Sequence, residues 1–379
     1  MNVVRGLATL LLVAGTARPL AAQGSTFGIQ GLGMPGRPVS GHDAALGGAL
    51  GAIDPTGTAN PAALGRFTGL AGWGVGAPAY RSFEGTGAVQ TFRATRFPLF
   101  GFASNIRRRL AVGLSAGDFL DRNWSVTESD TIVIRADTVP FDDAAQSLGG
   151  VSDLRLAAAY RASPRVSVGL AIHALSGSTR LTVRRNFDSN AYTDVSDVST
   201  TDFGGLGVSA GILASPAPRL DVGASIKLAG HLTAENSAGL SARVALPLEA
   251  TVSAAYEVVP GVALAGSAHH AGWSRASDDL VAAGQAPTRD LWAVAVGLDV
   301  DRANLLLARL PLRLGYRRTQ LPLQVGGAWL SERAVSGGIG LRFAGGRTTA
   351  DLAVESGSRE AGALRESFQT VFIGITVRP

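Results

Sequence analysis

Apolar residues alternate with small or polar residues along much of the chain. In residues 110–117, Leu, Val, Leu and Ala occupy every second position, and Ala, Gly, Ser and Gly fill the positions between them. The same alternation recurs in residues 166–173, 220–228 and 371–378. Because a period of two sends successive side chains to opposite faces of a strand, the pattern predicts β-strands with one apolar and one small or polar face.

This alternation predicts fourteen strand regions. They are residues 66–80, 86–106, 109–122, 147–162, 165–187, 199–215, 219–235, 238–258, 261–275, 289–301, 310–318, 330–343, 347–357 and 365–378. Tight connections, such as 163–164, alternate with longer polar ones, such as 123–146, 188–198, 276–288, 319–329 and 358–364. The segment 302–309 is the exception, because the alternation calls for a tight connection at this place and the segment is eight residues long. The rhythm is typical of an up-and-down barrel with short periplasmic turns and long outer loops.

The predicted fold class is all-β, a transmembrane antiparallel β-barrel of about fourteen strands. The sequence contains no run of 18 or more apolar residues, which is the usual sign of a membrane-spanning helix. In lipid, where no water reaches the backbone, a sheet must close on itself to satisfy every N–H and C=O group. The alternative is a secreted array of β-sandwiches, in which the same alternation would face water.

The residue pattern of the N-terminal region predicts an export signal followed by a segment that plugs the barrel. Residues 1–22 combine Arg5, a mostly apolar stretch from Gly6 to Ala14 and small residues before Gln23, which is the pattern of a signal peptide. Residues 23–65 are Gly-rich, lie outside the strand rhythm and carry apolar side chains, so we expect an N-terminal hatch inside the barrel. The barrel then comprises residues 66–379. Localisation in the cell outer membrane follows from this arrangement.

Composition narrows the function classes. The chain has no Cys, which excludes disulfides and thiolate metal sites. The formal net charge is only +5 in 379 residues, so we expect no nucleic-acid partner. His269 and His270 are neighbours on a predicted strand and point to opposite faces, so they cannot chelate one metal ion together. We predict no metal site and no cofactor.

Three stretches carry a resemblance to a known family. The first ends in Asn60-Pro61-Ala62, the second runs from Leu246-Pro247 to Trp273-Ser274, and the third begins at Pro311 and includes Tyr316. Together, and in this order, they resemble the outer-membrane long-chain fatty-acid transporter family, the FadL type. The resemblance implies a fourteen-strand barrel plugged by a hatch that ends at Asn60, Pro61 and Ala62.

The resemblance also implies a function. It is passive transport of long-chain fatty acids or similar hydrocarbons across the outer membrane, with lateral exit beside a kinked third strand. Here that strand is 109–122, and Gly113 or Gly117 is the expected kink. The expected partners are a hydrophobic small molecule and outer-membrane lipid with lipopolysaccharide, and no catalysis is required. The alternative is a hatch-plus-barrel scaffold for protein secretion or surface attachment, for which the sequence identifies no protein partner.

Three cations are candidates for binding a fatty-acid carboxylate. Lys227, Arg155 and Arg313 fall on the small or polar faces of predicted strands, and Lys227 is the only lysine in the chain. A mostly apolar pocket with one cation suits such a ligand. The alternative interpretation pairs these cations with luminal acids, such as Asp221, Asp351 and Glu355.

Two serines match a nucleophile motif by their letters. Ser115 and Ser209 each lie in a Gly-x-Ser-x-Gly pattern. That motif requires a sharp turn between a strand and a helix, whereas both serines lie inside alternating segments. We therefore interpret both as part of a small luminal face. A barrel hydrolase that uses either serine with His173 is the alternative.

Overall fold

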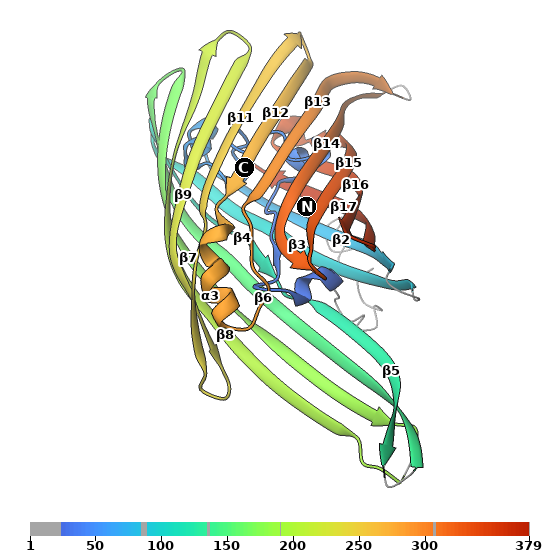
Figure 1. The fold of residues 1–379 in the computed structure, drawn as a ribbon. Coiled ribbons are helices and arrows are strands. Elements are labelled where there is room, and N and C mark those ends of the chain that lie inside the picture. The colour runs from blue at the N-terminus through green and yellow to red at the C-terminus, as the bar shows by residue number, and fades with distance from the viewer. Residues whose placement is uncertain (1–23, 85–88, 135–136, 190, 306–307, 379) are drawn as a thin grey trace, which may run out of the picture.

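The chain folds into a closed antiparallel β-barrel. The computed structural model describes residues 24–84, 89–134, 137–189, 191–305 and 308–378. Within them, 14 strands form the barrel wall, each paired with its neighbours in chain order, and β17 pairs with β2 to close the ring (Figure 1). The predicted fold class is confirmed. The predicted signal peptide, residues 1–22, and Gln23 lie outside the described residues.

The wall strands correspond one to one with the predicted strand regions. They are β2 (Ala71–Glu84), β3 (Val89–Arg107), β4 (Leu110–Asp121), β6 (Asp137–Ser163), β7 (Val166–Phe187), β8 (Val195–Ala217), β9 (Leu220–Asn236), β11 (Leu248–Val259), β12 (Val262–Ala271), β13 (Leu291–Leu305), β14 (Ala308–Val325), β15 (Ala328–Phe343), β16 (Thr348–Ala361) and β17 (Leu364–Val377). The short elements are η2 (Thr26–Ile29), β1 (Met34–Pro35), α2 (Gly41–Ala45), η3 (Pro61–Arg66), β5 (Trp124–Ile134), β10 (Ser241–Ala245), η4 (Trp273–Ala276), α3 (Ser277–Ala282) and η5 (Ala344–Gly346). None of the described helices has the length and apolar character needed to cross a membrane.

Several predicted loops are strand extensions. The segment 123–146 forms the hairpin of β5 with the first half of β6, and β6, β7 and β8 reach 27, 22 and 23 residues. These extensions project well beyond the rest of the barrel (Figure 1). The segments 319–329 and 358–364 are also mostly strand, with tight turns at 326–327 and 362–363. The sequence missed these pairings because strands that leave the membrane no longer need an apolar face.

The prediction of one strand over 238–258 is wrong. The chain breaks at Leu246-Pro247, where β10 ends and β11 begins. Proline has no backbone N–H to donate to a ladder, so it interrupts the strand. β10 pairs with β9 alone, whereas β11 pairs with both β9 and β12. The segment 302–309 is likewise not one loop, since β13 extends to Leu305 and β14 begins at Ala308.

The predicted apolar faces point outward. Leu170 and Leu206 are 68% and 74% exposed, and the outward residues of the other wall strands are mostly Val, Leu and Ile. An apolar surface that encircles the whole molecule is far larger than water-soluble monomers expose, so it is the lipid-contacting face of a transmembrane barrel. The inward positions between them carry Gly, Ala, Ser or charged residues.

The N-terminal segment lies inside the barrel, and inward-facing glycines receive its backbone. A Cβ on Gly315 would overlap the backbone of Leu46, and one on Gly211 would overlap the side chain of Asn60. The same close approach to hatch atoms occurs at further inward glycines, namely Gly169, Gly223, Gly297, Gly338 and Gly374. The unusual glycine content of the chain, 49 residues, is therefore partly explained by these notches in the wall.

We expect Gly315→Ala to unseat the hatch. The added methyl group meets backbone rather than a flexible side chain, so Leu46 has to move, and overpacking of this kind costs about 1–3 kcal/mol. Planar-bilayer recordings should show higher conductance than for the unaltered protein. Gly74→Ala is the matched control, because nothing lies within 4 Å of a Cβ there. Equal conductance of the two variants would contradict the seating argument.

Candidate functional site

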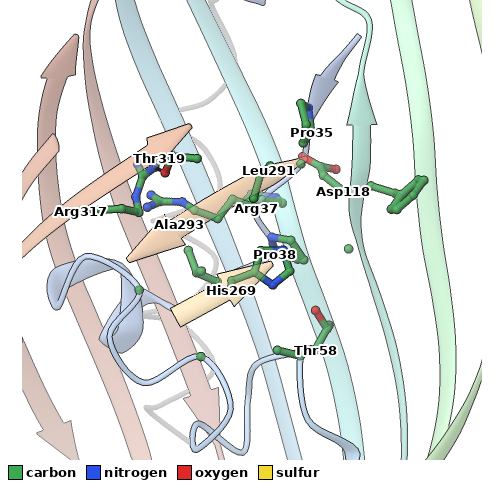
Figure 2. A pocket seen from close by; sticks show the side chains of 18 of the residues that line it. Pro35, Arg37, Pro38, Thr58, Asp118, His269, Leu291, Ala293, Arg317 and Thr319 are labelled. Atoms are coloured by element: carbon green, nitrogen blue, oxygen red, sulfur yellow. Dashed lines mark hydrogen bonds between the residues drawn. The ribbon is translucent and has the colours of Figure 1, made fainter. Parts of the chain in front are cut away.

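A cavity of about 330 Å³ lies between the hatch and the barrel wall. Figure 2 shows side chains of the hatch and of the strands around this space, among them Arg37, Pro38, His269, Leu291 and Arg317. Part of its lining is apolar and includes the large side chains of Phe119, Trp273, Leu291, Leu321, Phe368 and Phe372. Another part of the lining is charged or polar. The cavity can therefore hold a molecule that is mostly apolar but carries a polar group.

The barrel wall is interrupted beside this cavity. β3 pairs with β4 only from Arg107 to Leu99, which faces Gly117, and the two strands make no further pair within the described residues. Beyond that point β4 pairs with β1 instead, with Met34 opposite Asp121 and Pro35 opposite Leu120. The backbone N–H of Gly36 also donates to the carbonyl of Phe119 at 2.7 Å. We call this place, where the hatch substitutes for β3, the seam.

The expected kink lies close to the seam. Gly117 is the last β4 residue paired with β3, and a Cβ there would press on Pro38 of the hatch, whereas Gly113 faces Leu64. The irregularity of the strand falls two residues beyond Gly117, since the pairing of β4 with β6 shifts register between Asp118 and Leu120. No glycine marks that bulge, so the sequence carried no signal for it.

An ion pair spans the seam. Arg96 of β3 contacts the carboxylate of Asp121 on β4, and the other oxygen of that carboxylate accepts from the backbone and side-chain amides of Asn123 at 3.0 and 2.7 Å. Arg122 donates to the carbonyl of Gly31 at 3.1 Å. The seam is thus closed by the two registered pairs of β1 with β4 and by charge, and not by a ladder between β3 and β4.

Asn60 fastens the end of the hatch to the wall. Its side-chain oxygen accepts from the N–H of Ala62 at 2.9 Å and caps η3, where Pro61 is the first residue. Its amide nitrogen donates to the carbonyls of Ala52 at 2.7 Å and Ile212 at 3.0 Å. One buried side chain therefore connects the hatch turn, η3 and β8.

A series of side chains, mostly of alternating charge, connects the hatch to the four strands β14, β15, β16 and β17. We call it the charge ladder; in spatial order its members are Ser25, Glu366, Arg359, Glu332, Arg317, Glu355 and Arg37. Arg37 and Arg317 both bind Glu355, at 2.6 and 3.1 Å. Ser25 donates to Glu366 at 2.8 Å. Both ends of the ladder are hatch residues, so it holds the hatch at two points.

A second row of polar side chains crosses five neighbouring strands, β6 to β9 and β11. Its members, which we call the polar row, are Asp153, His173, Ser209, Lys227 and Glu249, and all line the cavity. His173 contacts both oxygens of Asp153 at 2.9 Å through Nδ1 and Ser209 at 2.8 Å through Nε2. Lys227 binds Asp153 at 2.9 Å and Glu249 at 3.4 Å.

The three candidate cations differ in what they contact. Lys227 is held by two acids of the polar row, and Arg313 binds Asp351 at 2.5 Å and Asp299 at 3.6 Å. Arg155 is 1% exposed, and its Nε and Nη2 have no hydrogen-bond partner among the described residues. It faces inward two residues along β6 from Asp153. The Nε of Arg313 likewise has no hydrogen-bond partner in the part of the chain that the structure describes. Of the three cations, only Lys227 lines the cavity.

The sequence anticipated some of this pairing and missed the rest. The suggested partner Asp351 does bind Arg313, whereas Asp221 binds Arg66 of the hatch and Glu355 belongs to the charge ladder. The ladder itself was missed. Its only sequence signal is that Glu332, Glu355 and Arg359 sit at inward-facing positions of an otherwise small-residue face. Within the described residues, no group of three or more potential metal ligands occurs.

A buried acid in the hatch gives it a pH-dependent contact. Burial, and next the neighbouring charge of Asp54, raise the pKa of Asp43 to about 7. Its carboxyl accepts from the N–H of Leu50 at 2.7 Å. Because the pKa is above its ordinary value, the folded hatch holds this proton more tightly than the unfolded chain does. That stabilisation is complete in acid and is lost as the pH rises through about 7.

We therefore expect the hatch to loosen between pH 6 and pH 8. Conductance in planar bilayers should rise over this interval in the unaltered protein. Asp43→Asn keeps the acceptor for Leu50 and removes the titration, so its conductance should stay flat and resemble the value at pH 6. A rise of the same size in Asp43→Asn would contradict this assignment to Asp43.

Comparisons with known proteins identify the fold. No protein-family model matches the chain, and no curated protein matches it in sequence. Among solved structures, the CymD monoaromatic hydrocarbon channel matches with a TM-score of 0.59 and 18% identity, over 90% of this chain and 97% of that one. The Ralstonia pickettii toluene transporter TbuX matches with a TM-score of 0.58 and 17% identity, over 91% and 99%.

A Pseudomonas aeruginosa FadL homologue is also similar, with a TM-score of 0.61 and 15% identity over 91% of this chain and 98% of that one. At these identities the likeness concerns the fold. The protein has the plugged fourteen-strand barrel fold of the FadL-type hydrocarbon channels.

Proposed function

We propose that the protein is an outer-membrane channel for passive uptake of a hydrophobic small molecule. The observation that supports this most directly is the position of the cavity, which is enclosed between hatch and wall and borders the seam at Gly117, Asp118 and Phe119. A ligand in this cavity has a short lateral way into the surrounding lipid. In this proposal residues 23–65 act as the hatch and residues 66–379 as the barrel.

The end of the barrel from which the solute would enter is apolar. A buried cluster between the N-terminal segment and the outer rim includes Phe27, Phe203, Trp273, Leu280 and Leu323. Trp273 also lines the cavity, so apolar contacts continue from the rim to its interior. A hydrophobic solute gains roughly 25 cal/mol for each Å² of apolar surface that it buries along this route. The charge ladder and the polar row oppose the passage of ions, since a bare ion would have to compete with paired charges.

The proposed substrates are hydrocarbons or fatty acids. The similar structures include channels named for monoaromatic hydrocarbons and for toluene, and a FadL homologue. We propose that Lys227 receives the carboxylate when the solute is a fatty acid, because it alone of the three candidate cations lines the cavity, where a ligand carboxylate would take the place of Asp153 or Glu249. Arg155 and Arg313 are weaker candidates, since neither lines the cavity.

We expect Lys227→Gln to separate the two substrate classes. Loss of a charged hydrogen bond, about 1.5–3 kcal/mol, should raise the half-saturating concentration for oleate uptake at least about tenfold. Toluene uptake by the same cells should not change, because toluene has no group for the ammonium to bind. Equal losses for both compounds would mean that Lys227 supports the barrel and does not contact the ligand.

The seam can be tested by a reversible cross-link. Pro35 and Leu120 are registered partners across β1 and β4, and the chain has no Cys, so a Pro35→Cys/Leu120→Cys pair is the only thiol pair present. Oxidation should fix the hatch to β4 and lower uptake in whole cells by about tenfold or more, and reductant should restore it. The control is Ile339→Cys/Leu352→Cys, a registered pair on β15 and β16 far from the seam in the ring.

The result also bears on the alternative function, a scaffold for secretion or attachment. The observation that favours a scaffold is the long projection of β5 to β8 beyond the barrel (Figure 1). Oxidised and reduced seam variants with equal uptake would argue against transport through the seam and in favour of that alternative.

A further inference from the structure

Three members of the polar row have the connectivity of a hydrolytic triad. Ser209 Oγ lies 2.8 Å from Nε2 of His173, and Nδ1 of the same ring lies 2.9 Å from both oxygens of Asp153. These residues come from the neighbouring strands β8, β7 and β6, so the register of the strands brings them together. His173 is the registered partner of Gly207 on β8 and of Arg155 on β6. Its side chain reaches between Ser209 and Asp153. Neither a strand-to-helix turn nor adjacency in sequence is involved.

The contacts fix the roles of the two ring nitrogens. Asp153 also binds the ammonium of Lys227, so it is the anionic partner of this cluster and only accepts hydrogen bonds. Nδ1 of His173 must therefore carry the ring proton and donate it to Asp153. This leaves the lone pair of Nε2 to accept the hydroxyl proton of Ser209, which is the tautomer that a general base requires.

A positive charge stands beside the serine. Lys227 is the registered partner of Ser209 on the neighbouring strand β9, and side chains opposite each other in this way have Cβ atoms about 4.5–5.5 Å apart. Its ammonium has three donors, of which two are directed to Asp153 and Glu249. The ammonium also lies over the ring of Phe119, 4.7 Å from the ring centroid. A negative oxygen that develops on a carbonyl attacked by Ser209 would take the third donor in place of this weaker contact. Backbone amides of a strand cannot serve here, because the ladder uses them.

The cavity supplies the rest of the requirements. Ser209, His173 and Asp153 all line it, together with Phe119 and Trp273. Ser209 is 5% exposed and His173 is 3% exposed, so bulk water is largely excluded from the reacting atoms. An acyl chain fits the apolar side of the cavity while its ester carbonyl reaches the polar row.

We propose that Ser209, His173 and Asp153 form a serine-hydrolase site that cleaves hydrophobic carboxylic esters in the lumen. This activity goes beyond the proposed transport and does not depend on it. Ser209 Oγ forms a bond to the ester carbonyl carbon, and its proton passes to His173 Nε2. The carbon–oxygen bond to the alcohol breaks, and His173 returns that proton to the leaving oxygen.

One water molecule, which enters the cavity in the place left by the alcohol, then completes the cycle. Water attacks the acyl-serine with transfer of one proton to His173, the bond to Ser209 Oγ breaks, and the proton returns to the serine oxygen. The sum is ester plus water to acid plus alcohol, with no oxidation or reduction. Asp153 is a positioning residue, because it touches only His173 and Lys227 within the cluster and acts through the tautomer of the ring.

The test uses the full protein in detergent and two probes. A fluorophosphonate should label Ser209 covalently, as shown by peptide mass spectrometry, and p-nitrophenyl butyrate should be hydrolysed. Ser209→Ala should lose the label and lower the hydrolysis rate by about 10³ or more. Asp153→Asn should lower kcat by about 10²–10⁴ with little change in KM, which a merely structural loss would not reproduce.

Ser115→Ala is the matched control. Ser115 lies in the same Gly-x-Ser-x-Gly motif, is equally buried at 4% exposure and faces inward from β4, but it does not line the cavity. It should keep full labelling and hydrolysis. Toluene uptake by cells that carry Ser209→Ala should remain normal, so failure of hydrolysis and failure of transport are separate results. Absence of label on Ser209, or equal hydrolysis by the unaltered protein and Ser209→Ala, would overturn the proposal.

Discussion

The need to satisfy every backbone hydrogen bond without water governs this structure. In hydrocarbon an open sheet edge is too costly, so the ring must close, and β17 returns to β2 to do so. At one place the strands do not supply the closure: between β3 and β4 the residues around Pro35 and Gly36 complete the wall. The hatch is therefore part of the wall as well as a filling.

The same constraint explains the interior. Outward positions at the depth of the membrane must be apolar, so the polar side chains of the wall strands at that depth have to face inward, where each charge needs a partner. The charge ladder and the polar row meet this need with ion pairs that connect strands to each other or to the hatch. Arg155 departs from this pattern, because two of its donors have no partner among the described residues. The contact of Ser209 with His173 departs from it as well, because a hydroxyl group is not needed to balance any charge.

The sequence predicted the wall well because alternation is a local property that each strand displays by itself. It could not predict the long pairing of β5 with β6, since polar extensions have no lipid-facing side, nor the break at Pro247 within an otherwise regular segment. Ser209 with His173 could be named only as one alternative, and Asp153 could not be placed beside them, because their contact depends on the register of three strands and one residue of slip would separate them. The pairing of Arg313 with Asp351 was foreseeable only as one of several options.

The projecting strands have a consequence for proteolysis. β6, at 27 residues, spans roughly 90 Å of extended chain, about three times the thickness of the hydrocarbon layer. Even when tilted, such a strand carries its tip well past that layer and into water. The hairpins are then the part of the molecule that a protease meets most readily, and clipping them would leave the ring of strands intact.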